Sequence, residues 1–354
     1  MAGDLPALER DAFPSYELST MSHCLSFDQT GRPADVLKLA PHPLPPLESH
    51  HVRVRLHYAP INPADLNFIE GTYGRLPNPP SIPGHEASGE VAEVGANVVS
   101  LKVGDPVIPL LGAGCWAQEM RAEEQHFAKL PKGIDLIQAS MLRINPVTAW
   151  LLLQHFEPLT KGDWIIQNAS NSGVGRSLIQ IAKKLGIHTL NLVRRPELIA
   201  ELKHIGADAV VLDTPEGVAE AKSILKDAKA KPSIAANGVG ADSAIRLMDL
   251  LAPGGTLVTY GAMSRSSLKV PNKFIIFKDL QLRGLWVTRW LEKAGSNALY
   301  EVLHPLAEMI LAGELVLPVE KVVPIEDFQD AISRAQEDGR NGKLILDLQG
   351  DSKK

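Results

Sequence analysis

The sequence predicts an α/β protein in which a β-rich domain carries an inserted, doubly wound parallel sheet. Its 354 residues exceed the length of one average domain, so two domains are expected. From about residue 50 to residue 140, short strands are separated by turns rich in Pro and Gly. From about residue 145, strands alternate with helices, which is the pattern of a parallel sheet covered on both faces.

The β-rich part is predicted from closely spaced strands with turn residues between them. We expect strands at 51–58 and 89–94, and a turn at 103–105 that leads into a third strand at 106–108. A helix at 299–311 and a last strand at 344–348 are expected to return to this domain. The parallel sheet would then be an insertion within the β-rich domain.

The inserted part is predicted from apolar periodicity and from the residues that end its helices. The first helix keeps Val174, Leu178 and Ile181 on one face and should end at Gly186, a suitable C′ residue. Pro196 is expected to open the second helix, which ends near residue 206. Strands are predicted at 164–169, 188–193, 209–212, 234–237, 256–260 and 280–286, with further helices near 216–228 and 242–251.

The predicted division is an N-terminal extension at 1–20, a β-rich domain at 21–144 and 292–354, and the inserted domain at 145–291. The extension contains four acidic residues against the single Arg10, whereas a mitochondrial presequence is Arg-rich and poor in acids. Two isolated cysteines, Cys24 and Cys115, indicate a reducing compartment. We therefore expect a cytoplasmic protein, with the mitochondrial matrix as the alternative.

Composition argues against two classes of partner. The net charge is −5, so the protein has no general attraction for nucleic acid or anionic membranes. No apolar run approaches the roughly 20 residues that span a bilayer. We expect neither a nucleic acid nor a membrane partner.

A turn of small residues between the first strand and helix of the inserted sheet predicts a dinucleotide site. Gly173 and Gly175 stand where the helix begins, so backbone N–H groups can approach a pyrophosphate. The turn lacks a complete GxGxxG pattern, and a purely structural turn is the alternative.

Arg194 and Arg195 follow the second strand, where an NAD site would place an acidic residue for the ribose 2′-hydroxyl. Guanidinium groups instead suit a 2′-phosphate. The sequence therefore predicts NADPH, and a solvated helix cap is the alternative for this pair.

No catalytic metal is expected. Gly84-His85-Glu86 is the one suggestive tripeptide, but no cysteine lies near 62–65 to complete a zinc ligand set. His85 is therefore predicted to be a hydrogen-bonded loop residue. Without a Lewis acid, reduction of an activated C=C bond is the natural chemistry.

Several motifs resemble those of one family. GEVAEVG, INPVTAW, NASNSGVG, GGTLVTYGAM and FKDLQLRGLW are similar to the zinc-free branch of the medium-chain dehydrogenases/reductases. Within that branch, NPAD at 62–65 and GTYG at 71–74 resemble the 2-enoyl thioester reductases of the mitochondrial type. The similarity runs from about residue 22 to the C-terminus.

The resemblance implies a GroES-like catalytic domain with an inserted Rossmann domain, and NADPH-dependent reduction of trans-2-enoyl thioesters on coenzyme A or acyl carrier protein by a homodimer. It implies that Tyr73 is the catalytic residue. The cofactor contacts that it implies are Asn145, Asn171, Ser172, Gly173, Val174, Arg194, Arg195, Tyr260, Gly261, Ala262, Met263, Leu285, Trp286, Val287, Thr288 and Lys343. Arg143, Ala262 and His85 depart from the usual residues of the family.

The residues themselves leave alternatives open at several positions. Tyr73 can donate a proton to an enolate or pack in a loop. Asn145 can contact the nicotinamide or cap a helix before Pro146. Trp286 can line an acyl pocket or pack in the core. Phe274, with the segment 274–277, can line the pocket or form a dimer edge. Lys343 can meet a phosphate or lie exposed.

Other functions of the same fold also stay open. These are an NADPH:quinone oxidoreductase, a reductive carboxylase of enoyl-CoA, and a non-enzymatic NADPH-binding protein.

Overall fold

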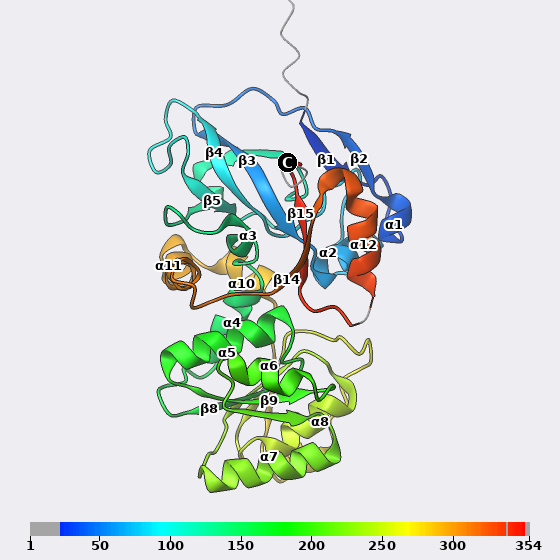
Figure 1. Cartoon of the computed structure of the whole chain (residues 1–354), viewed down its shortest axis with the longest axis vertical. Coiled ribbons are helices and arrows are strands. Elements are labelled where there is room, and N and C mark those ends of the chain that lie inside the picture. Colours follow the sequence, from blue (N-terminus) through cyan, green and yellow to red (C-terminus); the bar gives the residue numbers. More distant parts are fainter. Residues whose placement is uncertain (1–21, 338, 351–354) are drawn as a thin grey trace, which may run out of the picture.

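Two sheets follow one another along the long axis of the molecule (Figure 1). The computed structural model describes residues 22–337 and 339–350. The predicted extension at 1–20 lies outside these residues. The upper half is rich in strands, and the lower half is a parallel sheet with helices on both faces.

The upper sheet has seven strands in the order β14-β15-β3-β4-β5-β7, and β6 pairs with β3. Its strands are β3 (His51–Pro60), β4 (Ser88–Val94), β5 (Pro106–Pro109), β6 (Glu119–Glu123), β7 (Phe127–Lys129), β14 (Val319–Pro324) and β15 (Lys343–Asp347). A separate antiparallel pair is formed by β1 (His23–Ser26) and β2 (Lys38–Pro41). The short helices of this half are α1 (Pro33–Val36), α2 (Pro63–Glu70), η1 (Glu124–His126), α3 (Leu136–Ala139), η2 (Ile325–Asp327) and α12 (Phe328–Gln336).

The lower sheet has six parallel strands in the order β10-β9-β8-β11-β12-β13. These are β8 (Trp164–Gln167), β9 (His188–Val193), β10 (Ala209–Leu212), β11 (Ile234–Asn237), β12 (Thr256–Thr259) and β13 (Gln281–Gly284). Its helices are α5 (Gly173–Leu185), α6 (Leu198–His204), α7 (Pro215–Asp227), α8 (Ala241–Leu250) and α9 (Asn272–Ile276). The strand order reverses between β8 and β11, and ligands of such sheets bind beyond the carboxyl ends of the strands at this point.

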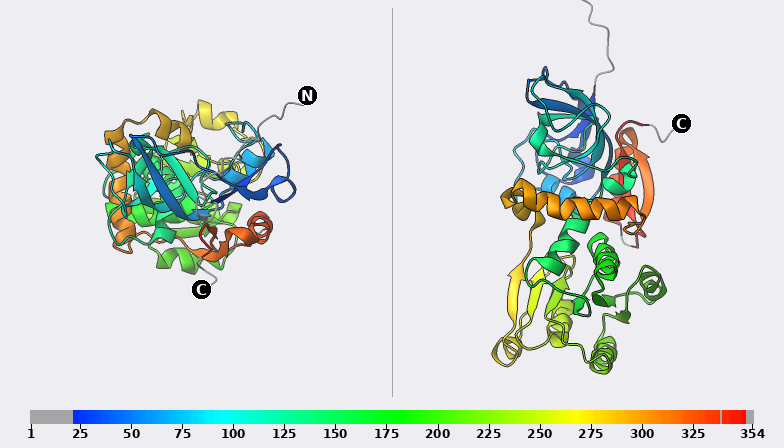
Figure 2. Two further views of the ribbon diagram at one scale, coloured as in Figure 1. Left: turned by 90° about the horizontal axis from the view of Figure 1, so that it is seen from above. Right: turned by 90° about the vertical axis from the view of Figure 1, so that its left-hand side faces the viewer.

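Three helices lie where the two halves meet: α4 (Asn145–Gln154), α10 (Val287–Lys293) and α11 (Ser296–Leu311). The side view shows α11, in orange, crossing the molecule between the halves (Figure 2). Leu303 and Leu306 of α11 share one apolar cluster with Leu152 of α4 and Leu178 of α5. The same cluster contains Ile108 and Leu130 of the upper half. This continuous core therefore holds the two halves together.

The predicted strands at 188–193, 209–212 and 234–237 have the ends that the sequence indicated. Most other boundaries differ by one to three residues, and three differences have a visible cause or consequence. The first strand ends at Gln167 because Ala169 adopts a φ of +50°. Pro196 lies in the turn before α6, where its carbonyl accepts the N–H of Ile199 at 3.1 Å. The strand predicted at 280–286 is shorter, and Trp286 begins the turn into α10.

The terminal strand returns to the upper sheet, where β15 pairs with β3. Within the described residues, no helix is both long enough and apolar enough to cross a bilayer.

Candidate active site

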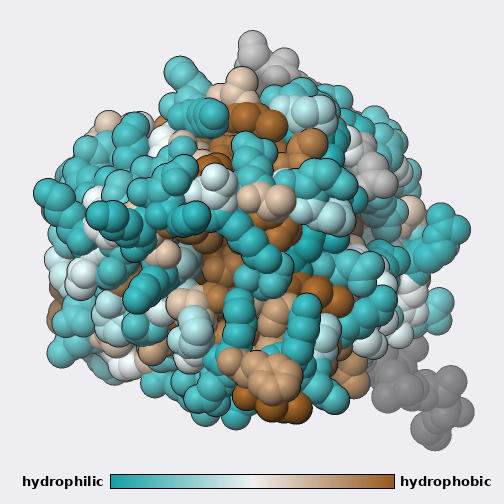
Figure 3. Space-filling model, turned by 90° about the horizontal axis from the view of Figure 1, so that it is seen from below, coloured by the Kyte–Doolittle hydropathy of each residue, from teal (hydrophilic) through white to brown (hydrophobic). Residues whose placement is uncertain are grey.

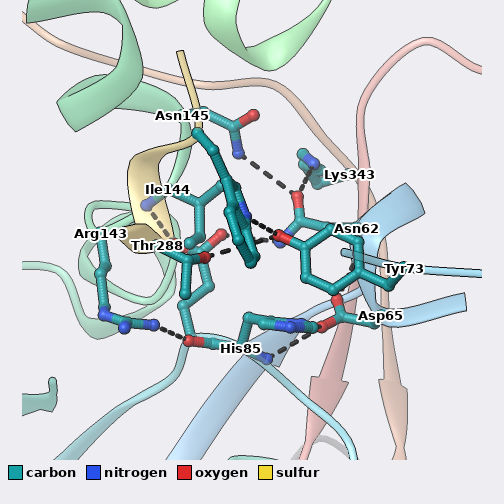
Figure 4. Close-up of polar contacts among 11 residues, drawn as sticks. Asn62, Asp65, Tyr73, His85, Arg143, Ile144, Asn145, Thr288 and Lys343 are labelled. Carbon is teal, nitrogen blue, oxygen red and sulfur yellow. Dashed lines mark hydrogen bonds and ion pairs between the residues drawn. The ribbon is translucent and has the colours of Figure 1, made fainter. Parts of the chain in front are cut away.

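Tyr73 lies in the loop that follows α2, beyond Gly71, which closes that helix with a φ of 75°. The Tyr73 hydroxyl accepts a hydrogen bond from the indole Nε1–H of Trp286 at 2.8 Å. It also lies 3.5 Å from the Thr288 hydroxyl (Figure 4). Residues predicted separately as the catalytic tyrosine and as cofactor contacts are thus brought together across the two halves.

The Tyr73 ring is held between two other rings. Its centroid is 5.1 Å from that of His85 and 5.7 Å from that of Trp286, both in edge-to-face geometry. Edge-to-face contacts place the positive rim of one ring on the negative face of the next. The alternative in which Trp286 is only a core residue does not fit, because it is partly exposed and hydrogen-bonded to Tyr73.

Behind Tyr73, His85 is bound to Asp65 of α2. The imidazole Nδ1 lies 2.5 Å from Asp65 Oδ1, which also accepts the His85 backbone N–H at 2.9 Å. Both residues are buried, with exposed fractions of 2% and 0%. The other Asp65 oxygen accepts the Asn62 backbone N–H in a capping box at the start of α2.

Asn62 joins four segments of the chain. Its amide donates to Glu86 Oε1 at 2.8 Å, and its oxygen accepts hydrogen bonds from Lys343 and, at 3.4 Å, from Asn145. Glu86 Oε2 in turn accepts the backbone N–H of Ile144 at 2.8 Å. The network thereby links the start of α2, the loop before β4, the start of α4 and the start of β15.

These contacts correct two of the alternatives. Asn145 does not cap a helix, because Ile144 holds that position and Asn145 is the first residue of α4. Its side chain is buried and faces Gly173, where a Cβ would lie 2.9 Å from the Asn145 amide. Lys343 does not lie exposed either, because its amine donates to Asn62 inside the network.

Burial perturbs the charged members of the network. It raises the pKa of Glu86 to about 7, against the opposing effect of the nearby Lys343 ammonium. Burial likewise lowers the pKa of Lys343, although Glu86 acts in the opposite direction. Glu86 therefore exchanges its proton near neutral pH, unlike an ordinary surface glutamate.

Arg143 is a buried cation that lies behind His85, on the side away from solvent. Its guanidinium donates to the carbonyl of His85 and, at 3.0 Å, to the carbonyl of Leu110. Only 2% of the residue is exposed. Two of the departures from the family pattern, Arg143 and His85, are therefore joined by a hydrogen bond.

The sequence did not single out Asn62, Asp65 or Glu86 individually as site residues. One pattern in the sequence could have indicated Asn62 and Asp65. Asn-Pro-x-Asp is typical of a helix N-terminus, in which the Asp side chain binds the backbone N–H of the Asn.

The N-terminus of α5 lies beside this cluster, because a Cβ at Gly173 would lie 2.9 Å from the Asn145 amide. Ser172 caps the helix by accepting the Gly175 N–H at 3.1 Å. A Cβ at Gly175 would lie 2.5 Å from the Ser170 carbonyl, so the turn requires glycine there. Asn171, Gly173 and Val174 complete this N-terminus, whose free N–H groups form an anion-binding position.

Arg194 and Arg195 directly follow β9, the neighbour of β8 in the sheet. Arg194 is exposed, and Arg195 lies 3.4 Å from the carboxylate of Glu197. Parallel pairing brings both arginines to the same edge as the N-terminus of α5.

The turns after β12 and β13 reach the same edge. After β12 come Tyr260, Gly261, Ala262 and Met263, and the Met263 N–H bonds to the Gly238 carbonyl at 3.0 Å. Burial raises the pKa of Tyr260 to about 12, against a smaller opposite effect of Ser172. Within the part of the chain that the structure describes, the Tyr260 hydroxyl has no hydrogen bond of acceptable geometry.

Leu285, Val287 and Thr288 follow β13 and are buried at the start of α10. Phe274 is not brought to Tyr73. It is buried in a different apolar cluster, with Leu247 and Met248 of α8, and Lys273 lies over its ring at 4.8 Å. The Phe274 side chain therefore packs in the apolar cluster of the lower sheet, apart from Tyr73, and its role as a wall of the acyl pocket stays a prediction.

The suggestive tripeptide at 84–86 does not form a metal-ligand set with its neighbours. Among residues 22–337 and 339–350, no group of three or more His, Cys, Asp or Glu side chains is arranged to hold a metal ion. His85 uses Nδ1 toward Asp65, and both oxygens of Glu86 accept N–H groups.

Two family models match the chain: the alcohol dehydrogenase GroES-like domain at 48–132 and the zinc-binding dehydrogenase at 173–308. The mitochondrial enoyl-[acyl-carrier-protein] reductase of Rattus norvegicus is 40% identical over 92% of this chain and 88% of the relative. A solved structure of the mitochondrial 2-enoyl thioester reductase Etr1p/Etr2p heterodimer from Candida tropicalis matches with a TM-score of 0.84. It is 29% identical and covers 92% of this chain and 99% of that chain.

A complex of Etr1p with NADP and crotonyl-CoA matches with a TM-score of 0.85, again at 29% identity over 92% of this chain and 99% of that chain. The agreement extends over both halves of the molecule. The chain therefore belongs to the medium-chain dehydrogenases/reductases, in the family of the mitochondrial-type enoyl thioester reductases.

Proposed function

We propose that this protein catalyses the NADPH-dependent reduction of trans-2-enoyl thioesters, on coenzyme A or acyl carrier protein, to saturated acyl thioesters in fatty acid synthesis. One observation carries the proposal: the Tyr73 hydroxyl of the upper half contacts Trp286 and Thr288, which follow β13 at the carboxyl edge of the parallel sheet. The relatives act on the same substrate class by name, and a solved relative holds NADP with crotonyl-CoA.

The residues at the sheet edge fit NADPH. The N-terminus of α5 offers free N–H groups for the pyrophosphate, and Arg194 and Arg195 offer cations for the 2′-phosphate. The unpaired Tyr260 hydroxyl can be satisfied by a polar group placed between it and the N-terminus of α5. When bound, NADPH supplies the hydride that reaches the β-carbon of the substrate.

Tyr73 supplies the other half of the reaction. Negative charge develops on the thioester oxygen as the β-carbon is reduced, and the α-carbon must then gain a proton. Because the Trp286 indole can only donate, it occupies a lone pair of the Tyr73 oxygen and leaves the phenolic O–H able to donate, either to the Thr288 hydroxyl 3.5 Å away or to a bound substrate. Tyr73 therefore can donate a hydrogen bond to the oxyanion or a proton to the carbon.

The competing functions of the same fold differ in their substrates. We expect NADPH to be oxidised with crotonyl-CoA and much more slowly with a quinone, and bicarbonate should leave the product as butyryl-CoA. Rapid quinone turnover without crotonyl-CoA turnover would establish a quinone oxidoreductase instead. Formation of a carboxylated thioester with bicarbonate would establish a reductive carboxylase. A lack of turnover with tight NADPH binding would indicate a non-enzymatic role.

We further propose that the reaction needs no zinc. His85 is committed to Asp65, and Glu86 is committed to Asn62 and Ile144, so these groups serve the protein framework. Dialysis against a strong chelator should leave the rate with crotonyl-CoA unchanged, and loss of activity that zinc restores would contradict this part of the proposal.

We infer that the protein is a homodimer joined along β13, the edge strand of the lower sheet. All four residues of β13 are exposed, and apolar side chains lie beside it. These are Leu282, Ile275, Ile276 and Phe277. Hydrophobic side chains gather at the surface of this lower end (Figure 3). An exposed edge strand with apolar flanks favours pairing with another copy, and a solved relative is a two-chain assembly.

We infer a mitochondrial location in place of the cytoplasm expected from the sequence, because the relatives are mitochondrial by name. Expression of the full chain with a C-terminal fluorescent protein would test this directly. Diffuse fluorescence outside mitochondria would contradict it.

A further inference from the structure

Five aromatic rings form a continuous column that ends at Trp286, beside the Tyr73 hydroxyl. In order they are Phe27, Phe68, His85, Tyr73 and Trp286, with centroid separations of 6.0, 5.6, 5.1 and 5.7 Å. Every contact is edge-to-face. The column begins in the apolar core of the upper half, to which Phe27 and Phe68 belong. Rings packed in this way restrict one another's rotation.

His85 is the member of the column whose orientation is fixed by polar contacts. A carboxylate accepts hydrogen bonds only, so the 2.5 Å contact with Asp65 places the imidazole proton on Nδ1 and sets the ring plane. The His85 backbone is fixed as well, since its N–H bonds to Asp65 and its carbonyl accepts from Arg143. Figure 4 shows the imidazole beside Asp65, with the Tyr73 ring next to both.

One helix supplies both groups that fix His85 and leads to Tyr73. Asp65 and Phe68 lie three residues apart on α2, a spacing that places side chains on one face of a helix. The chain then turns at Gly71, and Tyr73 comes two residues later. The helix α2 therefore both holds the His85 ring, which packs on Tyr73, and leads into the loop that carries Tyr73.

Tyr73 depends on these packed rings for its orientation because its own loop is neither helix nor strand. Its hydroxyl contacts, Trp286 and Thr288, lie in the other half of the molecule and require the phenol to point in one direction. We propose that His85 is a positioning residue that holds the Tyr73 phenol in this direction. The inference rests on the proposed enoyl reductase function and goes beyond it by adding a residue that acts through Tyr73.

Two substitutions separate the ring of His85 from its hydrogen bond. His85→Asn keeps an N–H donor for Asp65 and removes the ring edge from Tyr73. His85→Phe keeps a ring and removes the donor. With crotonyl-CoA we expect kcat to fall about tenfold in His85→Asn and less than about threefold in His85→Phe. The KM for NADPH should stay within about twofold of the wild type in both. His304→Asn on the exposed face of α11 is the matched control and should behave as the wild type.

A double-mutant cycle then tests whether His85 acts through Tyr73. On the Tyr73→Phe background, His85→Asn should lower kcat by less than about twofold, because the hydroxyl to be positioned is already gone. The proposal is overturned if the tenfold loss persists on that background, if His85→Asn is as active as the wild type, or if His85→Phe loses as much as His85→Asn. A wild type that does not reduce crotonyl-CoA would instead refute the proposed function.

Discussion

Gly74 lies directly against the indole of Trp286: a Cβ atom at residue 74 would meet the six-membered ring at 3.4 Å. The loop that carries Tyr73 therefore leaves room for no more than a Cβ atom at residue 74 beside Trp286, the N-cap residue of α10. Together with the hydrogen bond from Trp286 to Tyr73, this contact joins the loop of the upper half to the segment that follows β13. The position of the phenol thus depends on both halves of the molecule.

Tyr73→Phe removes the hydroxyl and keeps the ring. We expect kcat with crotonyl-CoA to fall by about a hundredfold or more, which is the size of effect that general acids contribute. The dissociation constant for NADPH, measured by titration calorimetry, should stay unchanged. Tyr300→Phe on α11 serves as a control at an exposed tyrosine. Unchanged turnover in Tyr73→Phe would exclude Tyr73 from the mechanism.

Trp286→Phe keeps an aromatic ring and removes the N–H that bonds to Tyr73. Loss of one hydrogen bond of about 1 kcal/mol predicts a kcat about fivefold lower. Steady-state rates with crotonyl-CoA measure this effect. Trp164→Phe on β8, where the indole stacks on His188, is the matched control. An equal loss in both variants would mean that the effect is one of stability.

Most of the lower sheet could be predicted from the sequence because each element carries a local signal. The strands at 188–193 and 209–212 are short apolar runs between helices, and Gly186 ends α5 in the left-handed conformation. Arginines after a strand reach the sheet edge in any parallel sheet, so their approximate place follows from order alone.

The buried residues behind Tyr73, which are Asp65, His85 and Arg143, could not be predicted in this way, because their positions depend on long-range contacts. Nothing local to His85 indicates that Asp65, twenty residues earlier, would bind its ring. Similarly, Phe274 has the apolar character of a pocket wall, but its place beneath the sheet is decided by its contacts with α8. The role of a residue such as His85 or Phe274 is decided by its tertiary contacts and not by the local sequence pattern.

Arg194→Ala and Arg195→Ala test the choice of cofactor. If each guanidinium bonds to the 2′-phosphate, its loss should raise the KM for NADPH by about ten- to a hundredfold, because charge-assisted hydrogen bonds contribute about 1.5–3 kcal/mol. The KM for NADH should hardly change, which makes NADH the internal control. Equal effects on both cofactors would mean that the pair is a solvated cap and not a phosphate site.

Phe277→Glu tests the proposed dimer. Phe277 is 81% exposed next to the edge strand, so a charge there should not disturb the core. We expect light scattering after gel filtration to change from the mass of two chains to that of one, because a buried unpaired carboxylate opposes association. Val99→Glu, at an exposed valine in the upper half, is the control. A dimer that survives Phe277→Glu would place the interface elsewhere.

Glu86→Gln tests the buried acid through the pH dependence of stability. Burial raises the pKa of Glu86 from its ordinary value near 4.5 to about 7, so the folded protein retains a proton that the unfolded chain releases. Between these two values the folded state binds more protons, and its stability contribution is lost as the pH rises through about 7. Lys343 and Asp65 face this carboxyl group in both proteins.

Gln cannot ionise, although it loses one of the two N–H contacts of Glu86 and so carries a constant penalty. Denaturant unfolding from pH 5 to pH 8 should therefore move the stability difference in favour of Glu86→Gln by up to about 3 kcal/mol, at 1.36 kcal/mol per pKa unit. Glu220→Gln on the exposed face of α7 should show no such trend. A difference that stays constant across this range, or that moves in favour of the wild type, would mean that Glu86 is ionised throughout and that Lys343 outweighs its burial.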